Sequence, residues 1–252
     1  MSKNFELLQK LGREQELLGP TAPVNTDPSE ASAQPASPAS LEGATGPGLE
    51  QIVALVQNIF LARGAEAPRL VVFSSTERES GCTWVCARAA EVLSNRVAGS
   101  VCVIDANFLA PALDRQFPGE NRPGLAEALT RLDPIRTFAR ACSRNLWLIG
   151  AGAMDATSAS LLSSDRMRLR ITELRKEFDY VLIDTAAMAV SHDAIGIGAL
   201  ADGVVLVLKA NSSRRETARQ AVDNLQAGKA KVLGAVLNQR TYPIPESIYK
   251  RL

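Results

Sequence analysis

The stretch LVVFSSTERESGCT, residues 70–83, carries the clearest structural signal in this sequence. Its apolar first part, Leu70 to Phe73, predicts a buried strand, and the residues from Trp84 onward predict a helix. The loop between them is similar to the phosphate-binding pattern G-x-x-x-x-G-K-[ST]. In that pattern backbone amides hold the phosphates, the lysine neutralises them, and the hydroxyl binds magnesium.

The match to this pattern is incomplete. Gly81 and Thr83 stand in their expected places, but Cys82 replaces the lysine and Thr76 replaces the first glycine. We interpret the segment as a degenerate phosphate loop. An ordinary strand-to-helix turn is the alternative interpretation.

Short apolar runs and helix-like segments alternate along the rest of the chain. The runs are rich in Val, Ile and Leu and lack regular polar alternation, as is typical of central strands covered on both faces. Strands are expected at Leu70–Phe73, Ser100–Ile104, Leu146–Ile149, Tyr180–Ile183, Gly203–Leu208 and Val232–Leu237. Helices are expected at Leu49–Arg63, Thr83–Ser94, Gly124–Leu132, Ser164–Glu177 and Arg214–Ala227. This order predicts an α/β fold with a doubly wound, mostly parallel sheet and a ligand crevice at the carboxyl ends of the strands.

The first 48 residues differ in composition from the remainder. Within residues 1–18, leucines and one phenylalanine are spaced among charged residues as in a short amphipathic helix. Residues 19–48 are rich in Pro, Ala, Ser, Thr and Gly, which predicts a flexible linker. Residues 49–252 are long enough for one α/β domain. The N-terminal helix would dock on another protein or pack back onto this domain.

The overall charge gives no sign of a polyanion ligand. Lys and Arg number 28 against 27 Asp and Glu, and basic runs such as residues 166–175 alternate with other residues, as on solvated helix faces. No nucleic-acid partner is expected. No apolar segment reaches the roughly 18 to 20 residues that span a bilayer, and the N-terminus lacks the apolar region of a secretory signal. We therefore expect a cytoplasmic protein.

The four cysteines are Cys82, Cys86, Cys102 and Cys142. Their spacing matches no zinc site, although Cys82 and Cys86 would share a helix face. We expect them to be small buried residues in a reducing compartment.

Carboxylates follow two of the predicted strands. Asp105 ends the strand at 100–104, and Asp184 ends the strand at 180–183. Because the carboxyl ends of parallel strands meet at one edge of a sheet, we expect both side chains near the loop. There they can bind magnesium and orient a nucleophile beside a terminal phosphate. A single aspartate at such a place is equally consistent with a helix cap.

Six segments in order carry a resemblance to a known family. They are VCVIDAN at 101–107, GLAEAL at 124–129, LLSSDRM at 161–167, FDYVLIDT at 178–185, LADGV at 200–204 and GAVLN at 234–238. Together they resemble bacterial tyrosine kinases of capsule and exopolysaccharide export, which are related to the MinD and ParA ATPases. The resemblance covers about residues 49–252. It implies a P-loop NTPase fold of the MinD/ParA type, with ATP and Mg²⁺ as cofactors.

The same resemblance implies a partner. In this family it is a membrane-bound chain-length determinant or polysaccharide co-polymerase, which would bring the chain to the inner face of the membrane. A homo-oligomer or a complex with an active paralogue, which would supply the missing lysine, is also open. Val53 and Val56 stand where ring-forming members carry arginines, which disfavours a ring.

The resemblance also implies roles for individual residues. The nucleotide-binding positions would be Ser80, Gly81, Cys82, Thr83 and Asn238, the last matching an asparagine that reads the adenine edge. Asp105 and Asp184 would be the catalytic carboxylates and, with Thr83, the magnesium ligands. Tyr242 and Tyr249 fall where the family carries phosphorylated tyrosines. A packed C-terminal turn at residues 242–245 is the alternative.

The departures from the family pattern are concentrated around the phosphate site. Residues 78–82 read RESGC where the family has PGEGK, and the Cβ of Glu79 disfavours the positive φ that a phosphate nest often uses. Asn107 replaces a second carboxylate, and Leu109 and Ala110 replace arginines. A hydrogen bond to a charged group contributes about 1.5 to 3 kcal/mol, so the missing lysine alone should weaken phosphate binding roughly ten- to a hundredfold.

Three functions follow from these observations. The first is a degenerate tyrosine-kinase homologue that acts as a partner or regulator in exopolysaccharide assembly and binds ATP weakly or not at all. The second is an active ATP-dependent tyrosine autokinase. The third is a ParA/MinD-like ATPase switch, which is disfavoured because Glu77 occupies the place of an additional lysine in those proteins.

Overall fold

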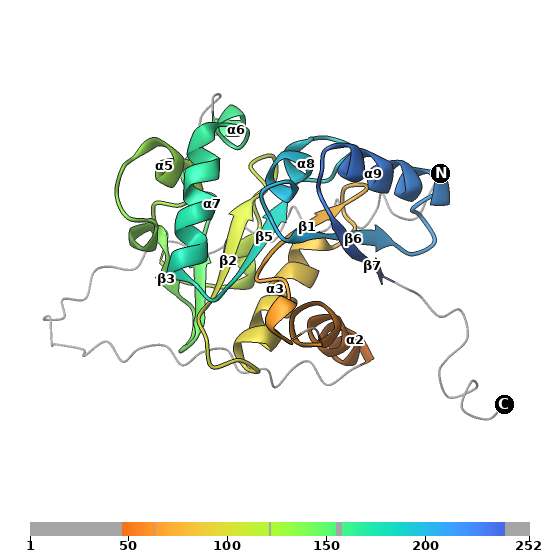
Figure 1. Ribbon diagram of the computed structural model, residues 1–252, viewed down its shortest axis with the longest axis horizontal. Helices are drawn as coiled ribbons and strands as arrows, with labels where there is room; N and C mark the ends of the chain where they lie inside the picture. The colour runs from red at the N-terminus through yellow and green to blue at the C-terminus, as the bar shows by residue number, and fades with distance from the viewer. Residues whose placement is uncertain (1–46, 63, 121, 155–157, 240–252) are drawn as a thin grey trace, which may run out of the picture. The chain divides into compact units, whose positions relative to one another are not determined.

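The computed structural model describes residues 47–239 except 63, 121 and 155–157, and it contains a seven-stranded sheet (Figure 1). The strand order is β3-β4-β2-β5-β1-β6-β7. The strands are β1 (Leu70–Ser75), β2 (Val101–Ala106), β3 (Arg140–Ala141), β4 (Leu146–Ile149), β5 (Tyr180–Thr185), β6 (Gly203–Lys209) and β7 (Val232–Asn238). All neighbours pair in parallel except β3 with β4. The expected doubly wound, mostly parallel sheet is confirmed.

Helices cover both faces of the sheet (Figure 1). They are α2 (Pro47–Val56), α3 (Cys82–Ser94), α4 (Leu113–Gln116), α5 (Leu125–Thr130), α6 (Ser158–Leu161), α7 (Asp165–Glu177), α8 (Asp193–Gly198) and α9 (Arg215–Ala227). A π-helical turn (Gln57–Leu61) follows α2, and 3₁₀ turns lie at Gly64–Glu66 and Ile135–Phe138. Helices α2 and α3 pack on one face, and α5, α7, α8 and α9 on the other.

The strands divide their side chains between two apolar layers. In β1, Leu70 and Val72 join the layer under α5, α7, α8 and α9, whereas Val71 and Phe73 join the layer under α2 and α3. All four side chains are fully buried. This explains why the apolar runs do not alternate with polar residues, because both faces of each central strand exclude water.

Small differences separate the expected from the observed elements. Helix α2 begins at Pro47 rather than Leu49, in keeping with the preference of proline for the first helical position. Strand β3, α4, α6 and α8 were not expected. Val56, one of the two valines that disfavour a ring by the family resemblance, is fully buried. A charged side chain therefore has no room there without a change in the packing of α2.

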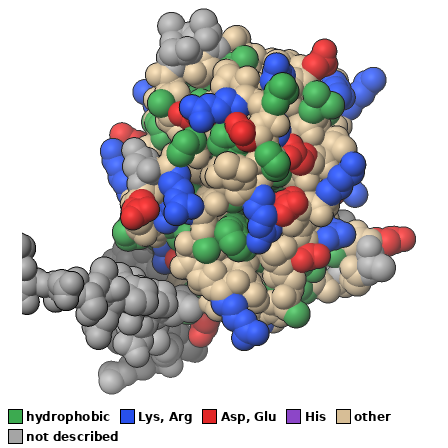
Figure 2. Space-filling model, turned by 90° about the vertical axis from the view of Figure 1, so that its left-hand side faces the viewer, with side chains coloured by type: hydrophobic (Ala, Val, Ile, Leu, Met, Phe, Trp, Pro, Cys, Tyr) green, Lys and Arg blue, Asp and Glu red, His purple; other side chains and the backbone are tan. Residues whose placement is uncertain are grey.

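The surface carries charges of both signs. Figure 2 shows Lys and Arg side chains interspersed with Asp and Glu over one face. Ion pairs among the described residues, such as Arg136–Glu177 and Arg175–Asp202, join charges of opposite sign. Among the described residues, no helix is both long and apolar enough to cross a membrane. Residues 1–18, most of the linker at 19–48, Tyr242 and Tyr249 lie outside the described residues.

Candidate functional site at the carboxyl end of the sheet

The loop between β1 and α3 has the backbone shape of a nest despite its composition. Glu79 has φ 59° and Gly81 has φ 77°. The expectation that the Cβ of Glu79 would keep it out of the left-handed region is therefore wrong. For a residue other than glycine this conformation costs about 1 to 2 kcal/mol, so other contacts must hold the loop in place.

The two glutamates of the loop do not converge on its centre. The hydroxyls of Ser75 and Ser80 both donate to the backbone carbonyl of Glu77, at 2.9 and 2.7 Å. The Glu77 carboxylate accepts hydrogen bonds from the hydroxyls of Ser212 and Ser213, between β6 and α9. Glu79 is exposed. Hydrogen bonds from Ser75 and Ser80 to the Glu77 carbonyl thus help to hold the loop in its conformation.

The end of β7 reaches the same loop. The side-chain amide of Asn238 donates to the carbonyl of Ser80, and that of Gln239 donates to the carbonyl of Glu79, each at 2.9 Å. A Cβ placed on Gly81 would lie 2.3 Å from Nδ2 of Asn238. Glycine at position 81 therefore suits both the left-handed φ and the close approach of this amide. The adenine-reading role of Asn238 stays a prediction.

Cys82 brings no positive charge to the site. It is the first residue of α3 and is 8% exposed. Burial, followed by the nearby Asp184 and Cys86, raises the pKa of its thiol well above the usual value. The thiol is therefore neutral at physiological pH. Cys86 and Cys102 are also buried, and Cys142 is half-buried, so burial is confirmed for three of the four cysteines.

Asp184 and Thr83 lie side by side. The Thr83 hydroxyl donates to Oδ2 of Asp184 at 2.6 Å. Asp184 is fully buried, and its Oδ1 has no hydrogen-bond partner among the described residues. Burial, with a smaller contribution from the charge of Asp105, raises the pKa of Asp184 to about 7. Its second oxygen is therefore free to hold a proton.

Asp105 is adjacent but differently bound. It pairs with Asp184 in the register of β2 and β5. Its Oδ1 accepts the amide of Asn107 at 3.0 Å, and its Oδ2 accepts the amides of Ala112 and Leu113 at 2.9 and 3.0 Å. Burial outweighs these three bonds and raises the pKa of Asp105 to about 6. Asp105 thus binds the amides at the start of α4, and its catalytic role stays a prediction.

The residues present supply only part of a magnesium site and no cation for a phosphate. Mg²⁺ prefers hard oxygen ligands, and Thr83 and Asp184 place two such groups together. Within the part of the chain that the structure describes, no group of three or more His, Cys, Asp or Glu is arranged to hold a metal. Three of the roughly four lone-pair directions of Asp105 already accept backbone amides. Phosphate would find backbone amides but no cation from Cys82.

Sequence reasoning missed Gln239, Ser212 and Ser213 as contacts of this loop. For Gln239 the sequence offered one signal, the two consecutive amide side chains Asn238 and Gln239 at the end of the last predicted strand. The serines gave none, because their contact with Glu77 depends on β6 lying beside β1.

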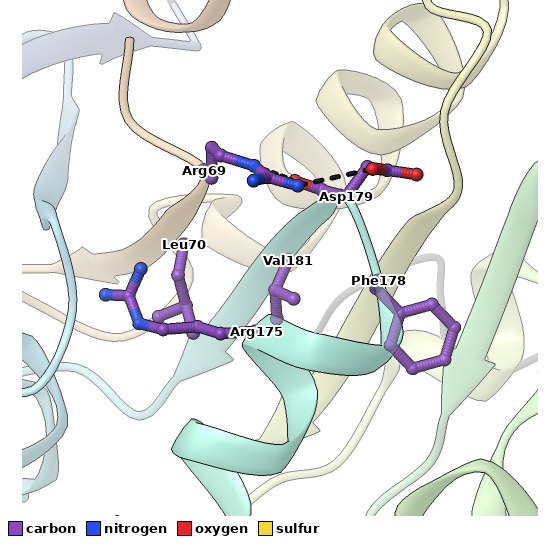
Figure 3. A pocket seen from close by; sticks show the side chains of 6 residues that line it. All are labelled: Arg69, Leu70, Arg175, Phe178, Asp179 and Val181. Carbon is purple, nitrogen blue, oxygen red and sulfur yellow. Dashed lines mark hydrogen bonds and ion pairs between the residues drawn. The ribbon is translucent and has the colours of Figure 1, made fainter. Parts of the chain in front are cut away.

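A separate hollow of about 160 Å³ lies at the other end of the sheet, beside the amino ends of β1 and β5. Figure 3 shows Arg69 and Asp179 pointing toward each other across its rim. Arg175, which also lines it, pairs with Asp202 at 2.8 Å. Its charged side chains are thus already paired.

No family model matches the chain, but curated relatives do. Tyrosine-protein kinase YwqD of Bacillus subtilis (strain 168) is 29% identical over 190 residues, which span 75% of this chain and 80% of YwqD. The succinoglycan biosynthesis transport protein ExoP of Rhizobium meliloti (strain 1021) is 28% identical over 180 residues. That match spans 70% of this chain but only 23% of ExoP.

Solved structures share the fold. The chimerical protein CapA2B2 matches with a TM-score of 0.72 at 20% identity, over 80% of this chain and 88% of that chain. A ParA family ATPase from Chlorobium tepidum TLS matches with a TM-score of 0.55 at 19% identity, over 73% and 80%. The fold expected from the sequence, that of the MinD/ParA type of P-loop NTPase, is confirmed.

Proposed function

We propose that this chain, a homologue of the bacterial tyrosine-protein kinases, is a catalytically impaired module of exopolysaccharide or capsule biosynthesis. It acts as a partner or regulator of a membrane-bound polysaccharide co-polymerase. ATP and magnesium bind to it weakly or not at all. The match to a succinoglycan biosynthesis transport protein supports the pathway.

The observation that carries this proposal is the state of Cys82. The lysine of the phosphate-loop pattern is replaced by a buried thiol whose pKa is raised. In addition, the Asn238 amide occupies the space beside Gly81 that the absence of a Cβ leaves open, and it donates to the carbonyl of Ser80. A triphosphate entering this loop would meet backbone amides without the compensating charge, which is the main source of affinity for a polyanion.

Calorimetric titration with ATP and magnesium tests the proposal. We expect weak or undetectable binding by the wild-type chain. The Cys82→Lys variant restores the cation and should bind roughly ten- to a hundredfold more tightly. Gln226→Lys is the matched control, because it adds the same charge at an exposed position on α9. Micromolar binding with steady ATP turnover by the wild-type chain would refute the proposal.

An active autokinase is the second candidate, and two observations favour it. Glu79 and Gly81 keep the left-handed backbone of a nest, and Oδ1 of Asp184 accepts no hydrogen bond from the described residues. In this case Tyr242 or Tyr249 should carry phosphate that disappears in Asp184→Ala. Mass spectrometry of the chain isolated with its membrane partner decides this, and an unmodified tail would exclude self-phosphorylation.

A further inference from the structure

Two consecutive side chains at the end of β7 bind two consecutive carbonyls of the degenerate phosphate loop. Asn238 bonds Ser80, 158 residues away, and Gln239 bonds Glu79, 160 residues away. Both acceptors are backbone carbonyls, so the NH₂ group of each amide must face the loop. The two bonds therefore fix the orientation of both side chains as well as the position of the loop.

The backbone conformation on both sides of this contact indicates that the surrounding structure fixes the two segments. Glu79 has φ 59° and Gln239 has φ 58°, so both residues joined by the outer bond are in the left-handed region. Such conformations persist outside glycine only where the surroundings fix them. The inner bond requires glycine at position 81, since any Cβ there would collide with Nδ2 of Asn238.

We propose that Asn238 and Gln239 form a clamp that holds residues 77–81 in the shape of a phosphate loop when no phosphate is bound. They are positioning residues of this loop. Glycine at position 81 suits the clamp, because a Cβ there would lie 2.3 Å from Nδ2 of Asn238. The inference goes beyond the proposed function, since it concerns the loop without nucleotide and does not depend on whether ATP binds.

Limited proteolysis of the nucleotide-free, full-length chain tests the clamp. Arg78 lies in the loop and is exposed, and Arg144, exposed in a turn before β4, serves as an internal reference. An arginine-specific protease cuts after Arg78 only when the loop opens, so the cleavage rate follows the population of the open loop. Asn238→Ala combined with Gln239→Ala should raise the rate after Arg78 about tenfold and leave that after Arg144 unchanged. Gln226→Ala is the matched control, as an exposed amide on α9.

A conservative variant separates positioning from general destabilisation. Asn238→Ala combined with Gln239→Lys keeps an N–H donor within reach of the Glu79 carbonyl and adds no arginine site, so it should restore most of the protection. Fluorescence of Trp84, in the first turn of α3, should change in the double alanine variant and return with the lysine. Unchanged cleavage after Arg78 would overturn the clamp. Equal acceleration after Arg78 and Arg144 would also overturn it, because the pair would then support the whole fold.

A second arm uses Cys82→Lys. If that variant binds ATP, Gln239→Ala, which leaves the candidate adenine-reading Asn238 in place, should weaken its binding several-fold, since the loop must then be ordered during binding. Unchanged affinity would count against the clamp. Should Cys82→Lys fail to bind ATP, the proposed cause of impairment is wrong, and the proteolysis still decides the clamp.

Discussion

Replacing Asp184 by asparagine should stabilise this protein at neutral and alkaline pH. The carboxyl group is fully buried, one of its oxygens has no partner among the described residues, and its neighbour is a second carboxyl group. Its pKa rises from 3.8 to about 7 in the folded chain. Between these values the native state holds a proton that the unfolded state has lost. The free energy of unfolding therefore falls as the pH rises through this window.

The size of the effect follows from the same two values. A difference of about three pKa units corresponds to about 4 kcal/mol once the folded group is fully ionised. The asparagine side chain of the variant would retain an oxygen that accepts the Thr83 hydroxyl but would leave a buried NH₂ group to be satisfied, which costs about 1 to 3 kcal/mol. We expect a net gain of about 1 to 3 kcal/mol near pH 8 and about none near pH 5, where the native wild-type group already holds its proton.

Urea denaturation followed by circular dichroism measures this gain. The wild-type chain and Asp184→Asn are compared from about pH 5 to about pH 8 in EDTA, because magnesium would bind the charged form. Asp223→Asn, at an exposed position on α9, is the matched control and should change stability by less than about 0.5 kcal/mol. A variant that is less stable than the wild type at pH 8, or that keeps the same pH dependence, would refute the reasoning.

Three further outcomes are expected. Arg170→Ala should lower the free energy of unfolding, measured by urea denaturation, by about 2 to 4 kcal/mol. The buried guanidinium binds Glu173 and two backbone carbonyls at the end of α5. The exposed Arg168→Ala is the control and should have little effect. Glu79→Gly should raise the unfolding free energy by about 0.5 to 1 kcal/mol by removing left-handed strain, and a loss of stability would show that the Glu79 side chain has contacts of its own. In thiol labelling of the native chain, Cys142 should react first and slowly, because its pKa is raised to about 11 and the other three cysteines are buried; rapid labelling of all four would contradict the packing of α3 and β2.

The sheet was predictable because its signal is local. Each central strand is a short apolar run, such as Leu70 to Phe73, that is buried on both faces. Strand β3 and α8 were missed for physical reasons as well. Two residues of antiparallel pairing at Arg140–Ala141 carry no periodicity, and Asp193–Gly198 includes two glycines, which are poor helix formers.

The site was predictable only in outline. Strand order brings Asp105 and Asp184 together, and that could be argued from two apolar runs that each end in aspartate. The contacts that shape the loop were beyond such reasoning, because the bond from Gln239 to Glu79 spans 160 residues. It forms only when β7 has paired with β6 and β6 with β1, so that the residue after β7 lies beside the loop that follows β1. The left-handed backbone at Glu79 depends on it, which is why residue preference alone gave the wrong answer there.

Two retained motif residues show why a degenerate site is hard to interpret. Gly81 and Asp105 match the family pattern, but each also has a structural reason to remain. The Asn238 amide needs the glycine, and the start of α4 needs the carboxylate, which accepts its first amides. Neither residue by itself therefore indicates whether the loop binds phosphate. Cys82 and Asp184 are more informative, because the buried thiol brings no charge to the site and Oδ1 of Asp184 is left without a partner among the described residues. Whether the loop can hold a nucleotide is therefore best judged from Cys82 and Asp184, because Gly81 and Asp105 each also have a structural role.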